Sequence, residues 1–263
     1  MTMTALPHHL NRTVVIEASP QLVFSFFTES DKWAAWWGSG STIEPTTGGR
    51  MFIRHPNGIE ASGEVLEVVP PERIVFTYGF ASGDPMPPGS SRVTIRLEPI
   101  ALGTRLHLFH EFAEPKTRDE HVQGWRYQLS LFANVVADLL HRNASDAVDA
   151  WFAVWAEPDA GSRARQLASI ASADVRFRDR FSTIEGAAEL VPHIGAAQHF
   201  MPDLRLERVG AVRHCQGTVL ADWVMRGKDG QARASGTNVF VLQADGRIGS
   251  VIGFWGPLTS SQK

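Results

Sequence analysis

The sequence predicts an α+β protein with two domains, each built from an antiparallel sheet and a few helices. At 263 residues the chain is longer than one hydrophobic core usually serves, so two domains are expected. In the first half, runs of alternating apolar and polar residues precede one long amphipathic stretch, whereas in the second half helical patterns precede the strand-like runs. We place the boundary near Arg142, which divides the chain into residues 1–142 and 143–263.

Composition favours a folded, soluble protein and argues against a nucleic-acid partner. Hydrophobic residues make up 43% and charged residues 20%, and the net charge of −3 argues against nucleic acid and anionic membranes. The single cysteine, Cys215, cannot form an internal disulfide. Residues 1–11 lack the apolar core of a signal peptide, and no apolar run reaches the roughly 20 residues that span a bilayer. We therefore expect a cytoplasmic protein without a membrane partner.

The first half combines strand patterns with helical ones. Ser91–Glu98 alternates strictly between polar and apolar residues, which predicts an antiparallel sheet with one solvated face. Ser19 and Pro20 are typical of the start of a short helix, and Ser30 is suited to cap a second one. The other strands are predicted at Arg12–Glu17, Gly63–Val69, Arg73–Phe80 and Thr104–Phe112.

A long helix is predicted to close the first half. A capping box at Thr117–Glu120 precedes apolar residues that recur every three or four positions up to Leu139. Such a helix, laid along the concave side of a curved sheet, leaves a cavity between them unless large side chains fill the space.

Several motifs of the first half occur in the order found in one known family. They are Trp36-Trp37-Gly38, Gly48-Gly49-Arg50, Gly63–Val68 leading to Pro70–Arg73, Gly103–Leu106, and His121 with Gly124-Trp125. Together they resemble the domain named after the activator of the heat-shock protein 90 ATPase, within the START-like (SRPBCC, polyketide cyclase) superfamily. The resemblance covers about residues 10–140 and implies a helix-grip fold with a hydrophobic ligand cavity. Because this superfamily includes carriers, cyclases, receptors and co-chaperones, the resemblance implies no single activity.

Aromatic residues and one histidine are the candidates for lining this first cavity. His110 shares a strand face with Leu108 and Phe112, so it belongs to a row predicted to be buried. A buried histidine on an apolar face also fits a hydrogen-bonded core residue, and the aromatic cluster also fits an ordinary core. The candidate ligand-binding residues are Trp36, Trp37, Phe52, Phe76, Phe80 and His110.

The second half begins with helical patterns and ends with strands. Trp151 and Trp155 give the first helix a strongly aromatic face, and Arg163–Ala171 is predicted as the second helix. A short strand at Val175–Asp179 follows, and then a helical stretch with a break or kink at Pro192. The last strands are predicted at Leu204–His214, Thr218–Arg226, Ala232–Leu242 and Ile248–Trp255, joined by Asp-Gly turns.

Helices followed by a strongly bent antiparallel sheet resemble the nuclear transport factor 2-like fold. Ile184-Glu185-Gly186, Met201–Leu204 and Gly253-Phe254-Trp255 are similar to its SnoaL-like branch. The resemblance covers about residues 145–257 and implies a cone-shaped α+β barrel. Members include isomerases, cyclases, dehydratases and proteins without catalysis. Such domains often dimerise through their sheets, so the resemblance also implies a homodimer through the sheet of the second domain.

Asp179 is the candidate for chemistry in the second domain. It shares the apolar face of Val175–Asp179 with Phe177, at the end of a row predicted to be buried. Beside the ketosteroid isomerase pattern, Asp179 matches the catalytic carboxylate, Asn238 matches a proton-donating Asp, and Trp151 replaces an oxyanion-hole Tyr. Removal of a proton next to a carbonyl needs a base and a donor near an apolar cavity. The alternative is that Asp179 pairs with an arginine or caps the following loop.

Aromatic walls and histidines complete the candidates of the second domain. The expected ligand-binding residues are Trp151, Phe177, Trp223, Phe240 and Trp255. His193, His199 and His214 are further acid–base candidates, with surface or packing roles as the alternative. The sequence has no zinc-ligand spacing, phosphate loop or Gly-x-Gly-x-x-Gly motif, so we expect neither a metal nor a cofactor.

Three functions are compatible with these patterns. The first is a protein that binds small apolar molecules, such as a lipid, steroid or polyketide, in internal cavities. The second is a cofactor-independent isomerase, cyclase or dehydratase with Asp179 as general base and Asn238 as donor. The third, which rests on the resemblance of the first domain, is a co-chaperone-like interaction with heat-shock protein 90. We rank them in that order, with the first two close.

Overall fold

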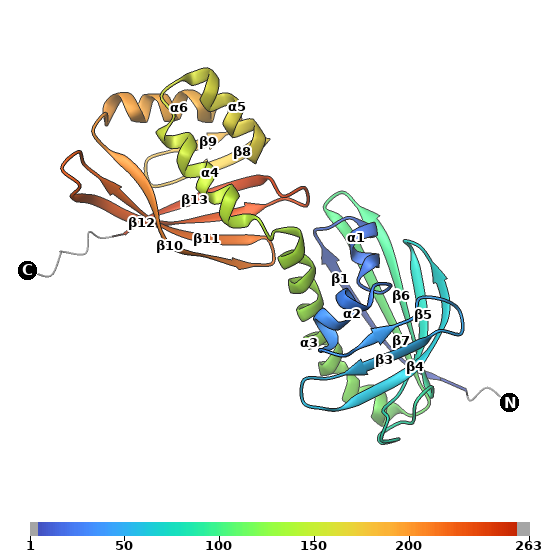
Figure 1. The fold of residues 1–263 in the computed structure, drawn as a ribbon. Coiled ribbons are helices and arrows are strands. Elements are labelled where there is room, and N and C mark those ends of the chain that lie inside the picture. Colours follow the sequence, from blue (N-terminus) through green and yellow to red (C-terminus); the bar gives the residue numbers. More distant parts are fainter. Residues whose placement is uncertain (1–4, 257–263) are drawn as a thin grey trace, which may run out of the picture. The chain divides into compact units, whose positions relative to one another are not determined.

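The computed structural model describes residues 5–256, whose helices and strands are drawn in Figure 1. The chain divides into two compact units between Ala137 and Asp138. This division falls in the last turn of helix α3 (Pro115–Leu140), shortly before the predicted position at Arg142. Each unit has its own sheet.

Within the described residues, the N-terminal unit contains a seven-stranded antiparallel sheet in the order β1-β7-β6-β5-β4-β3-β2. The first strand therefore pairs with the last, and hairpins join the other neighbours. Along β6 and β7, buried residues alternate with more exposed ones, which confirms a sheet with one solvated face. The strands are β1 (His8–Ile16), β2 (Thr42–Ile43), β3 (Arg50–Arg54), β4 (Glu60–Val69), β5 (Arg73–Tyr78), β6 (Ser91–Ile100) and β7 (Gly103–Phe112).

The helices of this unit begin close to the predicted positions. Helix α1 starts after Ser19, whose hydroxyl oxygen accepts a hydrogen bond from the backbone N–H of Leu22 at 3.3 Å. Helix α2 has Glu29 rather than Ser30 at its N-cap, and the Ser30 hydroxyl is instead bonded to the backbone of β2. Helix α3 begins at Pro115, just before the predicted capping box. The two short helices are α1 (Pro20–Ser25) and α2 (Ser30–Trp37).

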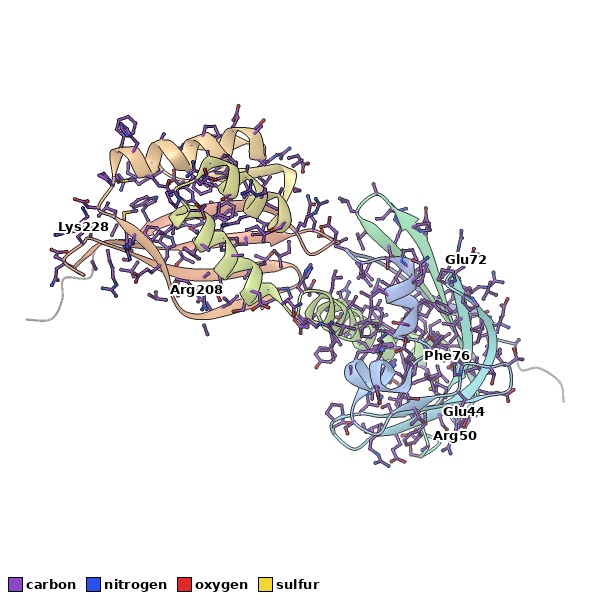
Figure 2. All side chains as sticks on the ribbon, turned by 45° about the horizontal axis from the view of Figure 1, so that its top comes forward. Glu44, Arg50, Glu72, Phe76, Arg208 and Lys228 are labelled. Carbon is purple, nitrogen blue, oxygen red and sulfur yellow. The ribbon has the colours of Figure 1, made fainter. Side chains whose placement is uncertain are left out.

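The N-terminal core lies between the inner face of the sheet and the helices. Trp125, Leu129 and Phe132 of α3 are almost fully buried, so the predicted apolar stripe faces inward. Figure 2 shows Phe76 among the side chains of this interior, while Glu72, just before β5, lies on the periphery. Burial of each large apolar side chain contributes roughly 1.5–3 kcal/mol, so this layer is the main source of stability for the unit.

Within the described residues, the C-terminal unit contains a six-stranded sheet in the linear order β10-β11-β12-β13-β8-β9. Neighbouring strands are antiparallel except β13 and β8, which run parallel. The α+β architecture is confirmed in both units, whereas the parallel pair was not predicted. The elements are α4 (Ala144–Ala156), α5 (Ala160–Ile170), β8 (Ala171–Arg178), β9 (Thr183–Glu185), α6 (Ala187–Phe200), β10 (Arg205–Cys215), β11 (Thr218–Arg226), β12 (Ala232–Leu242) and β13 (Ile248–Gly256).

Helices α4, α5 and α6 cover one face of this sheet (Figure 1). Val148, Trp151 and Phe152 of α4 are buried in the core, as the aromatic pattern predicted. Helix α6 continues through Pro192, where a break or kink was predicted, so the helix is not broken there. The proline lacks an N–H and so removes one hydrogen bond of the helix, but the flanking turns remain helical.

Candidate functional site

The C-terminal unit encloses a cavity of about 560 Å³ between the inner face of its sheet and α6. Strands β8, β11, β12 and β13 contribute to its walls, together with Trp155 near the end of α4. Most lining side chains are aromatic or aliphatic, and the polar ones are Asp179, Ser182, His193, Gln198 and Asn238. This size and this mixture of many apolar groups with a few polar ones are typical of a site for a small organic molecule.

Asp179 and Asn238 lie at one level of the sheet, on either side of Gly253. Asn238 of β12 pairs directly with Gly253 of β13, and Gly253 and Asp179 directly follow the paired residues Ile252 and Arg178. A methyl group built on Gly253 would lie 3.2 Å from Oδ1 of Asn238 and 3.3 Å from Cβ of Asp179. Because Gly253 has no side chain, a free space remains that both polar groups border.

Two neutral N–H donors hold the carboxylate of Asp179. Oδ1 accepts a hydrogen bond from the backbone N–H of Phe181 at 2.8 Å, and Oδ2 accepts one from Nε1 of Trp255 at 3.2 Å. The first bond caps the loop after β8, which is one of the roles considered for this residue. Since each carboxylate oxygen has two acceptor positions, both oxygens can still accept a hydrogen bond or a proton from a bound molecule.

A second glycine, one step further along the strands, makes room for an aromatic ring of the cavity wall. Gly236 of β12 pairs with Trp223 of β11 and with Trp255 of β13. The two indole rings meet edge to face, with centroids 5.0 Å apart and planes at 81°. A methyl group on Gly236 would lie 2.4 Å from the Trp223 ring and 2.0 Å from the carbonyl oxygen of Phe254, so the ring occupies the space of the missing side chain.

Several hydrogen-bonding groups at this cavity have no protein partner in the described part of the chain. Nε1 of Trp155 and Nε1 of Trp223 are buried and unpaired. Asn238 is 5% exposed, and its side-chain amide bonds to no described residue. Because buried polar groups are normally paired, these donors fit contacts with a bound molecule.

Of the three candidate histidines, His193 lines the cavity. Its Nε2 lies 3.3 Å from the hydroxyl oxygen of Ser182, and its ring packs against Trp155 and Phe177. His199 is exposed near the end of α6 and does not line the cavity. His214 lies on β10. Its Nε2 accepts a hydrogen bond from the backbone N–H of Gly217, so the ring proton is on Nδ1, which donates to the carboxylate of Asp138.

Two aromatic residues expected at the cavity, Trp151 and Phe240, lie in the hydrophobic core instead. Both are fully buried, and their rings meet edge to face at 5.9 Å. Trp155, one helical turn further along the same face of α4, reaches the cavity in place of Trp151. An oxyanion donor at Trp151 does not fit this geometry. The other wall candidates of this unit do line the cavity: Phe177, Trp223 and Trp255.

Several lining residues of the C-terminal cavity were not found from the sequence. Leu206 and Met225 face inward from β10 and β11, and the alternation of those strands could have identified them. Met201 and Leu204 belong to the loop after α6, where no periodic pattern exists to indicate an inner face.

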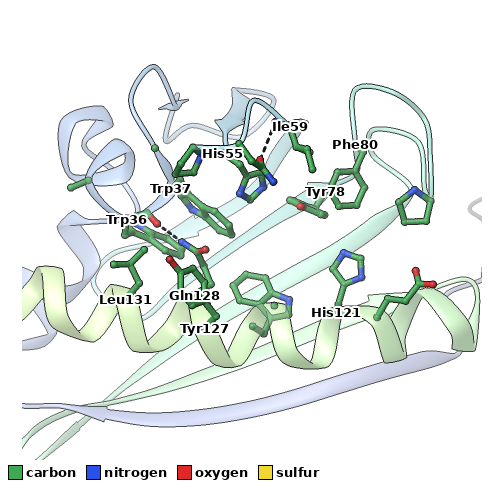
Figure 3. A pocket seen from close by; sticks show the side chains of 18 residues that line it. Trp36, Trp37, His55, Ile59, Tyr78, Phe80, His121, Tyr127, Gln128 and Leu131 are labelled. Carbon is green, nitrogen blue, oxygen red and sulfur yellow. Dashed lines mark hydrogen bonds between the residues drawn. The ribbon is translucent and has the colours of Figure 1, made fainter.

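The N-terminal unit has a cavity of about 590 Å³ between α2, α3 and β5, shown in Figure 3. Among the sequence candidates, Trp36, Trp37 and Phe80 line it, and Trp125 of α3 forms part of the opposite wall. Gly124 of α3 also lies at this cavity, and a methyl group built on it meets no atom within 4 Å. The glycine therefore leaves this side of the cavity open.

Phe52 and Phe76 were expected at this cavity and do not line it. Phe76 is fully buried in the core. Phe52 lies on the other face of β3, where the guanidinium groups of Arg50 and Arg54 approach its ring centroid to 5.3 and 5.7 Å. The centre of β3 is apolar at three successive positions, so its sequence contains no alternation from which the buried face could be predicted.

His110 is a fully buried residue whose hydrogen bonds are complete. Its Nδ1 accepts a hydrogen bond from Nε1 of Trp125 at 2.9 Å, so the ring proton is on Nε2, which donates to the hydroxyl oxygen of Ser91 at 2.9 Å. Ser91 in turn donates to the backbone carbonyl of Tyr78 at 2.8 Å. Burial lowers the pKa of His110 well below its ordinary value, so the ring is neutral at pH 7. This arrangement fits the core alternative.

Two histidines and a tyrosine at the N-terminal cavity are neutral at pH 7, and Glu120 lies at its exposed rim. Burial lowers the pKa of His55 and of His121, and it raises the pKa of Tyr78. Gln128 is buried, and its amide nitrogen donates to the backbone carbonyl of Trp36. Sequence reasoning did not assign these groups to the cavity, because their depth depends on how α3 packs against the sheet.

In the part of the chain that the structure describes, no group of three or more His, Cys, Asp or Glu side chains is placed to hold a metal ion. Cys215 is exposed at the end of β10. Between residues 5 and 256, no helix is both long enough and apolar enough to cross a membrane.

Fold and cavities together define a tandem of two α+β domains, each with an aromatic-lined cavity between its sheet and its helices. Residues 17–137 match the family model described as activator of Hsp90 ATPase homolog 1-like protein. Residues 148–251 match the family model described as SnoaL-like domain. The chain therefore joins an N-terminal domain of the first family to a C-terminal domain of the second, and both resemblances inferred from the sequence motifs are confirmed.

Solved structures resemble one half of the chain or the other. A SnoaL-like family protein from Agrobacterium tumefaciens is 25% identical over 45% of this chain and 99% of that chain, with a TM-score of 0.42. The Aha1 dimer from Colwellia psychrerythraea is 18% identical over 46% of this chain and 90% of that chain, with a TM-score of 0.41. A protein from Mesorhizobium loti is 21% identical over 49% and 96%, with a TM-score of 0.44. Comparison with curated proteins gives no match.

Proposed function

We propose that the protein binds small, largely apolar molecules, one in the cavity of each domain. The observation that carries the proposal is the pair of cavities, of about 590 and 560 Å³, each lined by aromatic residues and a few polar groups without a protein partner. Indole rings contribute flat apolar surface, and their N–H groups supply directional contacts.

A thermal-shift screen of lipids, steroids and polyketides tests this function. A ligand at a hundredfold excess over its Kd stabilises the folded state by about 2.7 kcal/mol, which raises the Tm by several degrees. A Cβ at position 124 would meet no atom within 4 Å, and Gly124 lines the N-terminal cavity. We therefore expect Gly124→Phe to be tolerated and to abolish the shift for ligands of that cavity. If no apolar compound stabilises the protein, the proposal is wrong.

Proton transfer at the C-terminal cavity is a second candidate function, favoured by the row of Asp179, Gly253 and Asn238. A ketone seated over Gly253 would have an α-carbon near the Asp179 carboxylate and its carbonyl oxygen near the Asn238 amide. The carboxylate would take the α-proton to leave an enol(ate) whose oxygen Asn238 stabilises, and return of the proton would regenerate the ketone or an isomer. No cofactor is needed for this step.

Deuterium exchange measures that reaction without knowledge of the natural substrate. We expect the protein in D₂O to accelerate exchange of the acidic C–H groups of 2-tetralone, followed by NMR. Asp179→Asn is expected to lower the protein-dependent rate by about 100-fold or more, and Asp174→Asn, at an exposed position of the preceding strand β8, to leave it unchanged. Full exchange activity in Asp179→Asn would remove this carboxylate from the mechanism.

The outer face of the C-terminal sheet is our proposed contact for a homodimer. Leu220, Val239 and Ile252 form an apolar row across three strands, on the face opposite the cavity. Beside this row, Val241 is 41% and Phe254 is 57% exposed, which is unusual for large apolar side chains unless a partner covers them. Light scattering should give twice the chain mass of 28.9 kDa, and Phe254→Glu should give the monomer. A monomeric wild-type protein would contradict this contact.

A further inference from the structure

We propose that the N-terminal cavity selects a neutral, largely apolar molecule that carries a hydroxyl group, and that this hydroxyl donates its hydrogen bond to Nε2 of His121. The inference deepens the proposed ligand binding and rests on it. It depends on three features: the tautomer of His121, the lack of charge inside the cavity, and an unpaired donor on Trp37.

A backbone carbonyl determines which nitrogen of His121 carries the proton. Nδ1 of His121 lies 2.7 Å from the carbonyl oxygen of Thr117, one helical turn earlier on α3. A carbonyl oxygen only accepts hydrogen bonds, so Nδ1 must be the donor. In the neutral ring, Nε2 then has a lone pair and no proton, and it has no partner within residues 5–256. His121 rises from α3 into the cavity below Tyr78 (Figure 3), so Nε2 is the ring nitrogen available to a ligand.

The surroundings of His121 keep its ring neutral. The rings of Tyr78, Phe80 and Phe112 lie within 6.1 Å of it, and this burial lowers its pKa, which opposes protonation at pH 7. The neighbouring ring of His110, with its centroid 5.6 Å away, is neutral because of its own hydrogen bonds and burial. A neutral His121 offers an acceptor, so the complementary ligand group is a donor such as a hydroxyl.

The other groups that face the cavity favour an uncharged ligand. His55 is neutral at pH 7 because burial lowers its pKa, the Tyr78 hydroxyl keeps its proton because burial raises its pKa, and the acidic Glu120 is exposed at the rim. No described residue offers a positive charge to the cavity interior, so an anion would lose its hydration without compensation.

Trp37 supplies the second polar contact. It is 5% exposed and lines the cavity, and its Nε1–H is buried without a partner in the described part of the chain. An oxygen of the ligand that accepts this N–H would satisfy a donor that is costly to leave unpaired. The site therefore fits a flat apolar ligand with a hydroxyl at the His121 side and an acceptor oxygen toward Trp37.

The indole resonance of Trp37 provides a readout confined to this cavity. We suggest titration of the full-length protein with naphthalene, 2-naphthol and 2-naphthoate at pH 7.5, followed through the Trp37 Nε1–H signal, which Trp37→Phe identifies. One neutral hydrogen bond changes affinity by roughly three- to tenfold, so 2-naphthol should bind that much more tightly than naphthalene. The carboxylate should bind most weakly.

Removal of the acceptor, Nε2 of His121, should abolish the preference for 2-naphthol over naphthalene and leave apolar binding intact. In His121→Leu, 2-naphthol is expected to bind like naphthalene, whereas His107→Leu, at a histidine on the solvated face of the sheet, should retain the wild-type ratio. Equal binding of both probes to the wild-type protein would overturn the role of His121 while apolar binding itself stands. Binding of neither probe would contradict both the inference and the proposed function of this cavity.

A measurement on the wild-type protein keeps the inference testable if His121→Leu does not fold. The ¹⁵N chemical shifts of His121 distinguish a protonated from an unprotonated ring nitrogen. We expect protonated Nδ1 and unprotonated Nε2 at pH 7.5, and a change in the Nε2 shift on addition of 2-naphthol but not of naphthalene. A proton on Nε2 in the free protein would overturn the assignment.

Discussion

Substitution of Gly253 by alanine is the most direct perturbation of the C-terminal site. The added methyl group would occupy the space between Asp179 and Asn238, at 3.3 Å from Cβ of the first and 3.2 Å from Oδ1 of the second. These separations are a few tenths of an ångström shorter than comfortable contacts. A small shift of the two side chains relieves them, so we expect a folded protein that loses about 1 kcal/mol of stability.

The effect on binding should exceed the effect on stability. A ligand atom seated over Gly253 can form hydrogen bonds with both neighbours, and the methyl group would exclude it. Loss of these two hydrogen bonds, one to the Asn238 amide and one to the Asp179 carboxylate, corresponds to about 2 kcal/mol or more, or at least roughly a thirtyfold increase in Kd. Isothermal titration calorimetry with the strongest hydroxyl-bearing ligand of the C-terminal cavity from the thermal-shift screen measures this change, because a hydroxyl can donate to Asp179 and accept from Asn238.

Another glycine of the same strand provides the control. A methyl group on Gly249 would meet the flexible side chain of Gln243 at 3.0 Å, and Gly249 does not line the cavity. Gly249→Ala should therefore bind ligand like the wild-type protein. If Gly253→Ala is folded and its Kd lies within twofold of the wild-type value, the space over Gly253 is not part of the binding site.

Three further perturbations have defined outcomes. Burial lowers the folded-state pKa of His110 and His121 from the ordinary value of 6.5. The unfolded chain therefore binds more protons than the folded one as the pH falls below 6.5. The free energy of unfolding of the N-terminal domain should decrease by roughly 1 kcal/mol or more between pH 7 and pH 5. Chemical denaturation at each pH measures this loss, and constant stability would contradict it. Trp255→Phe removes the indole donor to Asp179 and should cost about 1 kcal/mol by urea denaturation. Gly236→Ala would force a methyl group to 2.0 Å from a backbone oxygen of β13, so a soluble variant with wild-type Tm would show that the strands are not packed as described.

Sequence patterns were sufficient for the order of the longer elements, but they missed the short strands β2 and β9 and did not give the depth of side chains. Sequence periodicity indicates the face of an element on which a residue lies. It was enough to predict the alternation in β6 and β7 and the aromatic face of α4. Trp151 and Trp155 share such a face, yet Trp151 lies in the core and Trp155 at the cavity. Their difference depends on how α4 packs over the sheet, which local spacing does not contain.

Long-range pairing was the other missing information. The position of Asp179 beside Gly253 depends on the parallel pairing of β8 with β13, two strands far apart in the chain. A hairpin turn in the sequence indicates that the two strands it joins pair antiparallel, whereas a parallel pair has no such local signal. Similarly, the tautomer of His121 depends on where a helical carbonyl lies, so the sequence indicated a helix start there and not a ligand contact.

The row of Asn238, Gly253 and Asp179 also constrains how this protein can change during evolution. The three residues belong to different strands and mutate independently, but their side chains share one small space. Alanine at position 253 fits after a small shift, whereas a still larger residue needs a smaller one at position 179 or 238. Descendants that acquire a new ligand should therefore carry linked substitutions at these three distant positions, and comparison of such sequences would reveal the cavity floor without a structure.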